Sequence, residues 1–510
     1  MIGRLVLSSR NLYKINNPKN NKLVNARKCH ILSANVDDIL VPTDKEFSTR
    51  DIYIKLNNLN QIDQILGTVG NLQDDLNIYH YLYIKDWLSN KKYMDLWKEY
   101  NFSTFLSFDL ARGNRVGSNK QVITIDPFGS IDLDDGFSFD SDDFNYYLDI
   151  HISDPVSYFD FENSSMVKIF DEFVNRINTC YIPNSSGSNK PVHLLPENVV
   201  EYISLLEPNE KIRVRRAISF CFKINKETNQ VDWSIIFTNL TNIKNQTYED
   251  FDRKINEPEE SANKLDLVNL TNTMIKLLDL KYSLINLDAD ISHKMIEIFM
   301  IWTNYYCGKY LKSNSELMVV RVQEQKDLPD GLDLSRIPEY SRTFLNYSAN
   351  YELVDNKVNQ DLSLNHYSLG INNYSHTTSP MRRIIDMINH LQIHSCSNQI
   401  DRIKQIDIHM INEKIKIQKR ISNSYDLINY IKISNKFKAF VMDLKQLETK
   451  TNALLIITTT TGNFKKMINV ELPENTIQIN KYDQIDIEVY YNSNNFKSNK
   501  YPFSIKIIEN

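Results

Sequence analysis

The chain has 510 residues, of which 42% are hydrophobic and 24% charged, and its formal net charge is −5. This composition is typical of a soluble globular protein, and the length predicts two to four domains at roughly 100–200 residues each. The acidic balance excludes a protein coated in basic surface, although a local basic channel for nucleic acid stays open.

The five cysteines lie far apart, without a C-x-x-C pair. This spacing favours a reducing compartment and excludes a disulfide framework or a cysteine zinc site. The sequence shows neither a secretion signal nor an apolar run of 18 residues, so we expect no membrane contact. We therefore expect a cytoplasmic protein, encoded by a cell or by a virus.

Residues 1–90 contain short runs of β-branched and aromatic residues, broken by Asn, Asp, Pro or Gly. Such runs at close spacing predict a small barrel of the OB type. The last run, "NIYHYLYIK" at 77–85, is expected to be a strand like the others. Between 85 and 107 the apolar residues recur three and four apart, which predicts a helical junction with the next domain.

Strands and helices are mixed in the next region, an expected α+β core over residues 91–436. "NYYLDIHIS" (145–153) and "RAISFCFKIN" (216–225) are predicted strands, and the segments from Ser292, Ser379 and Ile411 have helical spacing. Residues 437–510 alternate again, which predicts a second OB-like barrel. Two such barrels beside an α+β core suggest single-stranded nucleic acid, although all-β modules also form protein contacts.

The segment "TIDPFGSIDLDDGFSFD", residues 124–140, gathers carboxylates within ten residues. The four that stand out are Asp126, Asp132, Asp134 and Asp135. Like charges this dense repel one another unless cations neutralise them, and Mg²⁺ prefers oxygen ligands. Two such ions could stabilise the attacking and leaving oxygens of a phosphodiester.

Two other interpretations of this acidic segment compete with a magnesium site. An EF-hand loop is excluded, because Ile131 stands five residues before Gly136 and Asp142, not Glu, stands six after it. A solvated acidic turn between two strands remains open on spacing alone.

Five segments, in order, resemble the RNase II/RNase R (RNB) family of exoribonucleases, closest in style to its exosome-type branch. The acidic segment is similar to the family's Asp followed, after five residues, by D-x-D-D. "YSHTTSPMRRIIDMINH" (374–390) is similar to its "YxHFTSPIRRYxDLxxH". The other resembling segments are 146–159, 178–199 and 292–311. The flanks resemble a cold-shock-type barrel, over 1–90, and the family's terminal RNA-binding barrel.

The resemblance implies a processive, hydrolytic 3′-to-5′ exoribonuclease that degrades single-stranded RNA with a free 3′ end to nucleoside 5′-monophosphates. The implied cofactor is Mg²⁺ or Mn²⁺, held by the four aspartates, with Asp132 and Asp134 closest to the chemistry. A threaded exonuclease needs no symmetry, so we expect a monomer.

The resemblance also implies roles for individual side chains. Arg382 falls where the family places an arginine against the scissile phosphate, a contact that suits a two-pronged guanidinium. Arg383 would be a second phosphate contact, or a partner of acids on its own helix. Tyr181 would stack on a base near the 3′ end. Glu297 would contact ribose hydroxyls, which distinguish RNA from DNA.

Some patterns stay open between a functional and a structural interpretation. Asp386, His390 and His394 share a helical face at i, i+4 and i+8, which could hold zinc, but internal hydrogen bonds are favoured. The basic stretches 211–216 and 414–420 could track RNA phosphates or form solvated faces.

The sequence departs from bacterial members of the family at one helix position. Asn423 stands where those members have a catalytic-site glutamate. Two alternatives to the exoribonuclease stay open. One is a catalytically inactive scaffold that binds RNA or partner proteins, and the other is a nuclease acting on single-stranded DNA. The retained aspartates with Arg382 argue against the scaffold, and only a comparison of substrates separates RNA from DNA.

Overall fold

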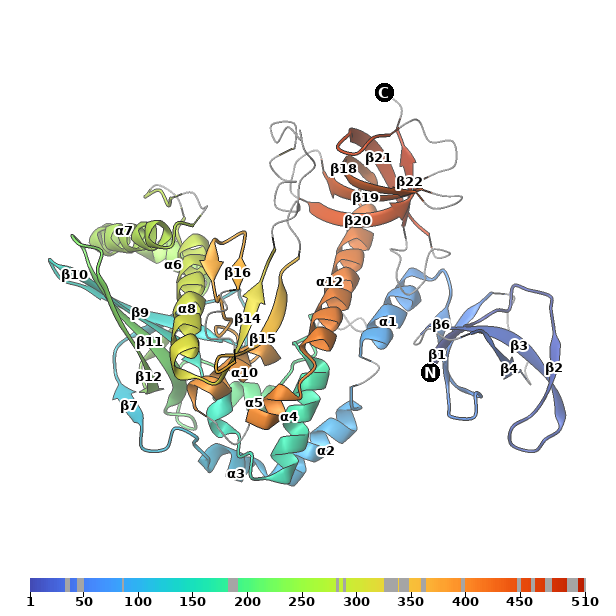
Figure 1. Cartoon of the computed structure of the whole chain (residues 1–510), viewed down its shortest axis with the longest axis horizontal. Coiled ribbons are helices and arrows are strands. Elements are labelled where there is room, and N and C mark those ends of the chain that lie inside the picture. Colours follow the sequence, from blue (N-terminus) through green and yellow to red (C-terminus); the bar gives the residue numbers. More distant parts are fainter. Residues whose placement is uncertain are drawn as a thin grey trace.

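A computed structural model shows three groups of secondary structure, with a mixed core between two β-sheets (Figure 1). The residues it describes are 1–32, 37–43, 50–84, 87–181, 191–280, 284–287, 290–324, 338, 348–358, 364–395, 400–446, 451–459, 464–472, 479–492 and 503–508.

The N-terminal group is a six-stranded sheet in the order β2-β3-β1-β5-β6, with β4 paired to β3. Alternate side chains of its strands meet in one small core that includes Leu5, Cys29, Val41 and Ile54. The strands are β1 (Ile2–Leu5), β2 (Tyr13–Asn16), β3 (Leu23–Ile31), β4 (Ile39–Pro42), β5 (Ile52–Leu56) and β6 (Ile62–Thr68).

The predicted strand over 77–85 is wrong, because this stretch lies mostly in helix α1 (Leu72–Tyr83). Its aromatic residues favour strands in isolation, but tertiary packing overrides such preferences. Ile78 and Tyr83 are buried in a cluster that includes Ile2 of the N-terminal sheet and Ile421 of helix α12 (Ile408–Ile431). Two acidic residues in the first turn also favour a helix start.

The centre of the core is a seven-stranded sheet in the order β13-β8-β9-β10-β11-β12-β7. Neighbouring strands are antiparallel except for the parallel edge pairs β13–β8 and β12–β7. The predicted strands over 145–153 and 216–225 are confirmed as β10 and β11. The strands are β7 (Arg115–Ser118), β8 (Val122–Ile125), β9 (Asp135–Ser141), β10 (Asn145–Ser153), β11 (Arg215–Asn225), β12 (Val231–Leu240) and β13 (Ile243–Gln246).

Three helices cover one face of this sheet and bury the largest apolar cluster of the described chain. They are α6 (Tyr248–Ile255), α7 (Ser261–Leu277) and α8 (Ser292–Asn314), with the short 3₁₀ turn η2 (Pro258–Glu260) between the first two. The predicted helix from Ser292 is confirmed as α8, which buries Phe299 and Trp302 against the sheet.

A second apolar cluster joins the remaining core helices to a two-stranded sheet, β14–β15. The helix predicted from Ser379 begins later, at Ile384, because Arg383 is extended (φ −136°, ψ 125°). The remaining elements of the core, including the separate pair β16–β17, are α2 (Asn90–Tyr100), α3 (Phe102–Ser107), η1 (Pro155–Tyr158), α4 (Ser164–Arg176), α5 (Glu197–Ile203), β14 (Leu317–Val322), β15 (Asn350–Asp355), β16 (Asn365–His366), β17 (Ile371–Asn372), α10 (Ile384–Ile393) and α11 (Ile400–Lys404).

The C-terminal group is a five-stranded antiparallel sheet whose edge strands, β20 and β22, contact each other and so close it toward a barrel. The long helix α12 leads to it from the core, with α1 beside it (Figure 1). The strands are β18 (Lys436–Gln446), β19 (Thr451–Thr458), β20 (Lys465–Glu471), β21 (Gln484–Tyr491) and β22 (Phe503–Ile507). The predicted fold class, an α+β core flanked by two OB-like β modules, is confirmed.

A search of the described helices for long apolar stretches finds none that could cross a membrane.

Candidate active site

The acidic segment folds back on itself between two neighbouring strands. Asp126 follows the end of β8, and its amide N–H donates to the carbonyl oxygen of Gln246 at 3.1 Å. The chain then turns at residues 127–130, where Gly129 adopts a positive φ of 83°, a conformation that favours glycine. β9 begins at Asp135, so the two carboxylates lie at the same end of adjacent strands.

Three of the four aspartates, Asp126, Asp132 and Asp135, line one cavity of about 830 Å³. Tyr181, Glu297, Arg382 and Arg383 line the same cavity. The structure therefore brings together every sequence-predicted site residue except Asp134, which is buried behind the cavity wall.

Asp134 is held by the segment that carries the arginines. The Met381 amide N–H donates to its Oδ1 at 2.8 Å, and the Arg382 Nε lies 3.5 Å from its Oδ2. The side chain is only 4% exposed, and Oδ2 has no hydrogen-bond partner among the described residues. A buried carboxylate oxygen without a hydrogen bond is unusual and is typical of a site completed by another group.

The electrostatics of the aspartates favour a positively charged ligand. Burial raises the pKa of Asp126 to about 7, and the negative charges of Asp135 and Asp132 add to this rise, which Arg382 opposes. Burial likewise raises the pKa of Asp135 to about 6. The pKa of the Asp134 carboxyl is raised well above its usual range, again mainly by burial.

The oxygen-rich lining, the mutual repulsion and the unpartnered oxygen of Asp134 fit a hard divalent cation. Within the described residues, however, no three Asp, Glu, His or Cys side chains converge on one point as a finished metal site. Asp132 accepts a hydrogen bond from the Tyr181 hydroxyl at 2.9 Å instead. Three aspartates thus line one cavity and the fourth contacts Arg382 at its wall, but in the described residues they do not form a closed ligand set.

Arg382 and Arg383 differ in their surroundings. The Arg382 side chain is 43% exposed, and its Nη2 donates to the Ser379 hydroxyl at 2.9 Å. The Arg383 Nη2 instead donates to the fully buried carboxylate of Asp386 at 2.7 Å, so this guanidinium is held by its own helix. Arg382 is therefore the more accessible to a phosphate, whereas Arg383 also has a structural role.

Tyr181 and Glu297 line the cavity from different segments of the chain. An isolated bridge pairs Asn178 with Arg383, which brings the segment ending at Tyr181 beside the arginines. Tyr181 is 50% exposed, and its hydroxyl is tethered to Asp132. Glu297 lies on α8, one turn beyond Lys294, whose Nζ is 3.3 Å from its carboxylate.

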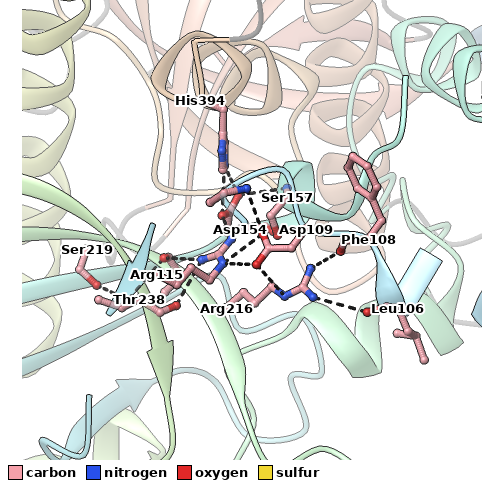
Figure 2. A network of polar contacts seen from close by, with 12 residues as sticks. Leu106, Phe108, Asp109, Arg115, Asp154, Ser157, Arg216, Ser219, Thr238 and His394 are labelled. Atoms are coloured by element: carbon pink, nitrogen blue, oxygen red, sulfur yellow. Dashed lines mark hydrogen bonds and ion pairs between the residues drawn. The ribbon is translucent and has the colours of Figure 1, made fainter. Parts of the chain in front are cut away.

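A polar network centred on Asp154 and Arg115 lies next in sequence to a backbone contact of Asp134 (Figure 2). The Ser153 amide N–H donates to the Asp134 carbonyl oxygen at 2.7 Å, and the next residue, Asp154, is fully buried. Its carboxylate contacts Arg115 at 2.6 Å and His394 at 3.0 Å. These contacts stabilise the charged form and hold the pKa of Asp154 below its usual range despite burial.

The contacts of Asp386, His390 and His394 argue against the zinc site that their helical spacing allowed. His394 faces Asp154, whereas the His390 Nε2 contacts the Thr377 carbonyl oxygen at 2.8 Å and Asp386 binds Arg383. The three side chains have separate partners and do not converge.

The first basic stretch, 211–216, and Asn423 lie outside the cavity lining, whereas Ile415 of the second stretch, 414–420, is part of it. In the first stretch, Arg215 is buried and donates to backbone carbonyls, and Arg216 donates to the Phe108 carbonyl at 2.6 Å. Asn423 lies on α12, where its side-chain oxygen accepts from Lys466 of β20 at 3.1 Å. The replaced position therefore faces the C-terminal sheet in this structure.

Tyr248 and His376 are among the cavity residues that sequence reasoning missed. Tyr248 opens α6, and burial together with the charges of Asp135 and Asp126 raises its pKa to about 12. No motif marks this tyrosine. The Nδ1 atom of His376 forms a hydrogen bond of 2.7 Å with the Tyr351 hydroxyl. Burial lowers the pKa of His376 well below its usual range. It stands inside the "YSHTTSPMRR" segment, so that motif could have indicated it.

A carboxylate-lined cavity with an accessible arginine and an exposed aromatic ring has the features of a site for a metal-bound phosphate chain. Residues 117–399 match the model of the RNB domain. The chain therefore belongs to the RNB family.

Two curated relatives illustrate the match. Ribonuclease R of Chlamydia pneumoniae is 24% identical over 365 residues, covering 62% of this chain and 52% of that protein. The mitochondrial exoribonuclease II of Saccharomyces cerevisiae is 26% identical over 380 residues, covering 61% of this chain and 38% of that protein. The chain thus spans about half the length, or less, of the curated relatives it matches.

Solved structures share the fold over most or all of the chain. Mycoplasma genitalium RNase R in complex with ribose-methylated single-stranded RNA superimposes with a TM-score of 0.67 at 15% identity, covering 100% of this chain and 90% of that one. Yeast Ssd1, a pseudonuclease, superimposes with a TM-score of 0.54 at 14% identity, covering 87% and 63%. The fold alone therefore occurs both with and without nuclease activity.

Proposed function

We propose that this protein is a 3′-to-5′ exoribonuclease that hydrolyses single-stranded RNA processively to nucleoside 5′-monophosphates, acting as a monomer. The observation that carries the proposal is the set of aspartates gathered with Arg382 and Tyr181 around one cavity. The family and the RNA-bound relative support the choice of RNA.

The aspartates and Arg382 have different roles in the proposed hydrolysis. Asp126, Asp132, Asp134 and Asp135 would hold two Mg²⁺ or Mn²⁺ ions, which supply positive charge to the phosphate and lower the pKa of water. The exposed guanidinium of Arg382 binds the scissile phosphate and offsets the charge that develops there. No other described arginine combines this exposure with contact to Asp134.

The remaining site residues position the RNA. The exposed ring of Tyr181, tethered through its hydroxyl, offers a face on which a terminal base stacks, a contact worth roughly 1–3 kcal/mol for any base. Glu297 accepts hydrogen bonds from ribose hydroxyls, which gives a preference for RNA over DNA. Arg383 contributes a second positive charge to the cavity while it holds Asp386.

The test uses RNA labelled at its 5′ end, a DNA copy, Mg²⁺ and the Asp134→Asn variant. Wild type should shorten the RNA stepwise from its 3′ end, EDTA should stop the reaction, and Asp134→Asn should lower the rate at least about 100-fold. Asp143→Asn, in the exposed turn after β9, is the matched control and should keep full activity.

The pseudonuclease among the structural relatives makes an inactive RNA-binding scaffold the second candidate. Binding of RNA by wild type and by Asp134→Asn, with both leaving it intact, would replace the enzyme proposal with this one. In that case Asn423→Glu tests whether the missing carboxylate explains the loss.

A further inference from the structure

A second cavity, of about 360 Å³, lies beside the aspartate cavity on the same face of the central sheet. Ile123 of β8 and Phe137 of β9 line the second cavity, whereas the residues two positions away toward the aspartates, Ile125 and Asp135, line the first. Helix α6 covers both, since its first residue, Tyr248, lines the aspartate cavity. None of the residues assigned above to RNA hydrolysis lines the second cavity.

The lining suits a flat ring. Phe139 and Phe251 contribute aromatic walls, and Phe251 packs edge-to-face on Phe137 with 6.1 Å between ring centroids. Aromatic walls of this kind hold planar heteroaromatic ligands. The volume is within the usual range of small-molecule sites and matches one nucleotide-sized ligand, not a longer strand.

One polar atom in this cavity lacks a partner. The Gln246 Oε1 is buried and accepts no hydrogen bond from any residue that the structure describes. Asp140 adds a second acceptor on the rim. A buried acceptor without a donor is costly, so a ligand with an N–H edge would be favoured here.

The charges on the rim define the rest of the ligand. Lys254, in the exposed last turn of α6, supplies a positive charge. Lys120 is already paired with Asp149 at 2.6 Å, and Glu260 accepts from Asn263 at 2.6 Å. The ligand therefore combines a donor-edged ring with an anionic group that reaches Lys254.

We propose that this cavity binds a nucleoside monophosphate with a donor-edged base, for which guanosine 5′-monophosphate (GMP) is the best probe. Guanine presents a ring N–H and an amino group on one edge, which match the two acceptors. Adenine offers only its amino group, and uracil has one N–H flanked by acceptors. The order of affinity should be GMP, then AMP, then UMP.

Binding at this cavity is coupled to the candidate active site through the chain itself. The Gln246 side chain lines the second cavity, and its carbonyl oxygen holds the amide of Asp126. On α6, Phe251 and Tyr248 face different cavities one turn apart. An occupied second cavity should therefore alter RNA hydrolysis, a consequence that rests on the proposed function.

Calorimetric titration of the full chain with GMP tests the proposal, with Lys254→Glu and Asn263→Trp as cavity variants. One GMP should bind per chain, at least tenfold more weakly in both variants. Lys276→Glu is the matched control, because Lys276 occupies the last turn of α7 away from the cavity. Arg382→Ala, which alters only the aspartate cavity, should also bind GMP normally.

Three results would overturn the proposal. The first is an absence of GMP binding at millimolar concentration. The second is binding that Arg382→Ala abolishes and Asn263→Trp does not, which would place GMP in the aspartate cavity. The third is binding of the dinucleotide GpG without binding of GMP, which would assign the cavity to a bound RNA strand. These titrations need no RNA cleavage, so failure of the proposed function would leave them valid.

Discussion

The carboxyl group of Asp126 is buried near other aspartates, and its pKa makes the folding stability of the protein depend on pH. Burial and the neighbouring aspartates raise its folded-state pKa to about 7, above the value of about 3.8 that an unfolded chain would show. The folded state therefore binds the proton more tightly, so stability falls as the pH rises from about 4 to about 7, and the full destabilisation remains above pH 7. Below about pH 4 both states are protonated and the effect vanishes.

Asp126→Asn should therefore stabilise the metal-free protein at pH 8, by about 2 kcal/mol after allowance for partial exposure, and should have little effect at pH 4. Urea unfolding in EDTA at the two pH values measures this difference. Added Mg²⁺ should reverse the order at pH 8, since the wild-type carboxylate gains a cation. Equal stability of the two proteins in EDTA at pH 8 would contradict the raised pKa.

The two neighbouring arginines should separate activity from stability. Arg382→Ala removes a half-exposed side chain and should lower the unfolding free energy by under about 1 kcal/mol, but reduce RNA hydrolysis at least about 100-fold. Arg383→Ala leaves the buried Asp386 carboxylate without its guanidinium and should cost about 3–5 kcal/mol of stability. Urea titrations and single-turnover rates on both variants are the measurements. If Arg382→Ala mainly lost stability and Arg383→Ala mainly lost activity, the roles assigned to the two arginines would have to be exchanged.

At the scale of elements, helix α8 is placed by a close backbone contact. A Cβ added to Gly308 would lie 1.9 Å from the Asn373 carbonyl oxygen, a distance that no relaxed structure tolerates. The backbone beyond β17 therefore packs directly on the helix at this glycine. This contact holds the wall of the aspartate cavity, which Glu297 and Asn304 of α8 help to form.

Gly308→Ala should consequently destabilise the protein by about 2 kcal/mol, because overpacking outweighs the gain of about 1 kcal/mol in helix propensity. Gly117→Ala in β7 is the control: nothing lies within 4 Å of its added Cβ, so its effect should stay within about 0.5 kcal/mol. The denaturant midpoints of both variants measure these changes in stability. A stabilised Gly308→Ala would mean that helix and loop separate readily.

At the scale of the whole molecule, Asp75 of α1 joins the two outer sheets. Its Oδ1 accepts from the Tyr53 hydroxyl of the N-terminal sheet at 2.7 Å, and its Oδ2 accepts from the Tyr491 hydroxyl of the C-terminal sheet. The carboxyl is 1% exposed, and burial raises its pKa. One buried side chain thus links strands that are more than 400 residues apart.

Asp75→Ala should loosen this junction, because the buried Tyr53 hydroxyl and the part-buried Tyr491 hydroxyl lose this acceptor at a cost of about 2 kcal/mol. Solution scattering should show a larger radius of gyration, and protease should cleave near α1 faster than in wild type. Tyr491→Phe removes only the C-terminal link and should give a smaller change in both measurements. An unchanged scattering curve for Asp75→Ala would show that other contacts suffice to hold the sheets.

Much of this protein could be predicted from local patterns. The alternation of β-branched residues indicated the outer sheets and the strands β10 and β11, and helical spacing indicated α8, because these signals depend on the side chains of one segment. The acidic segment and its resemblance to the RNB family indicated the site residues. The strand predicted over 77–85 failed since local preference could not show that Ile78 packs between two distant elements.

The tertiary structure alone decided which of these residues meet. Spacing could not show that Asp134 lies behind the cavity that Asp126 lines, or that Arg382 is accessible while Arg383 holds a buried acid. It could not show the adjoining cavity at Gln246, whose lining comes from two segments, 120–147 and 246–267, that are remote in sequence. A sequence determines chemistry and local conformation, but distance and burial between remote segments exist only once the chain has folded.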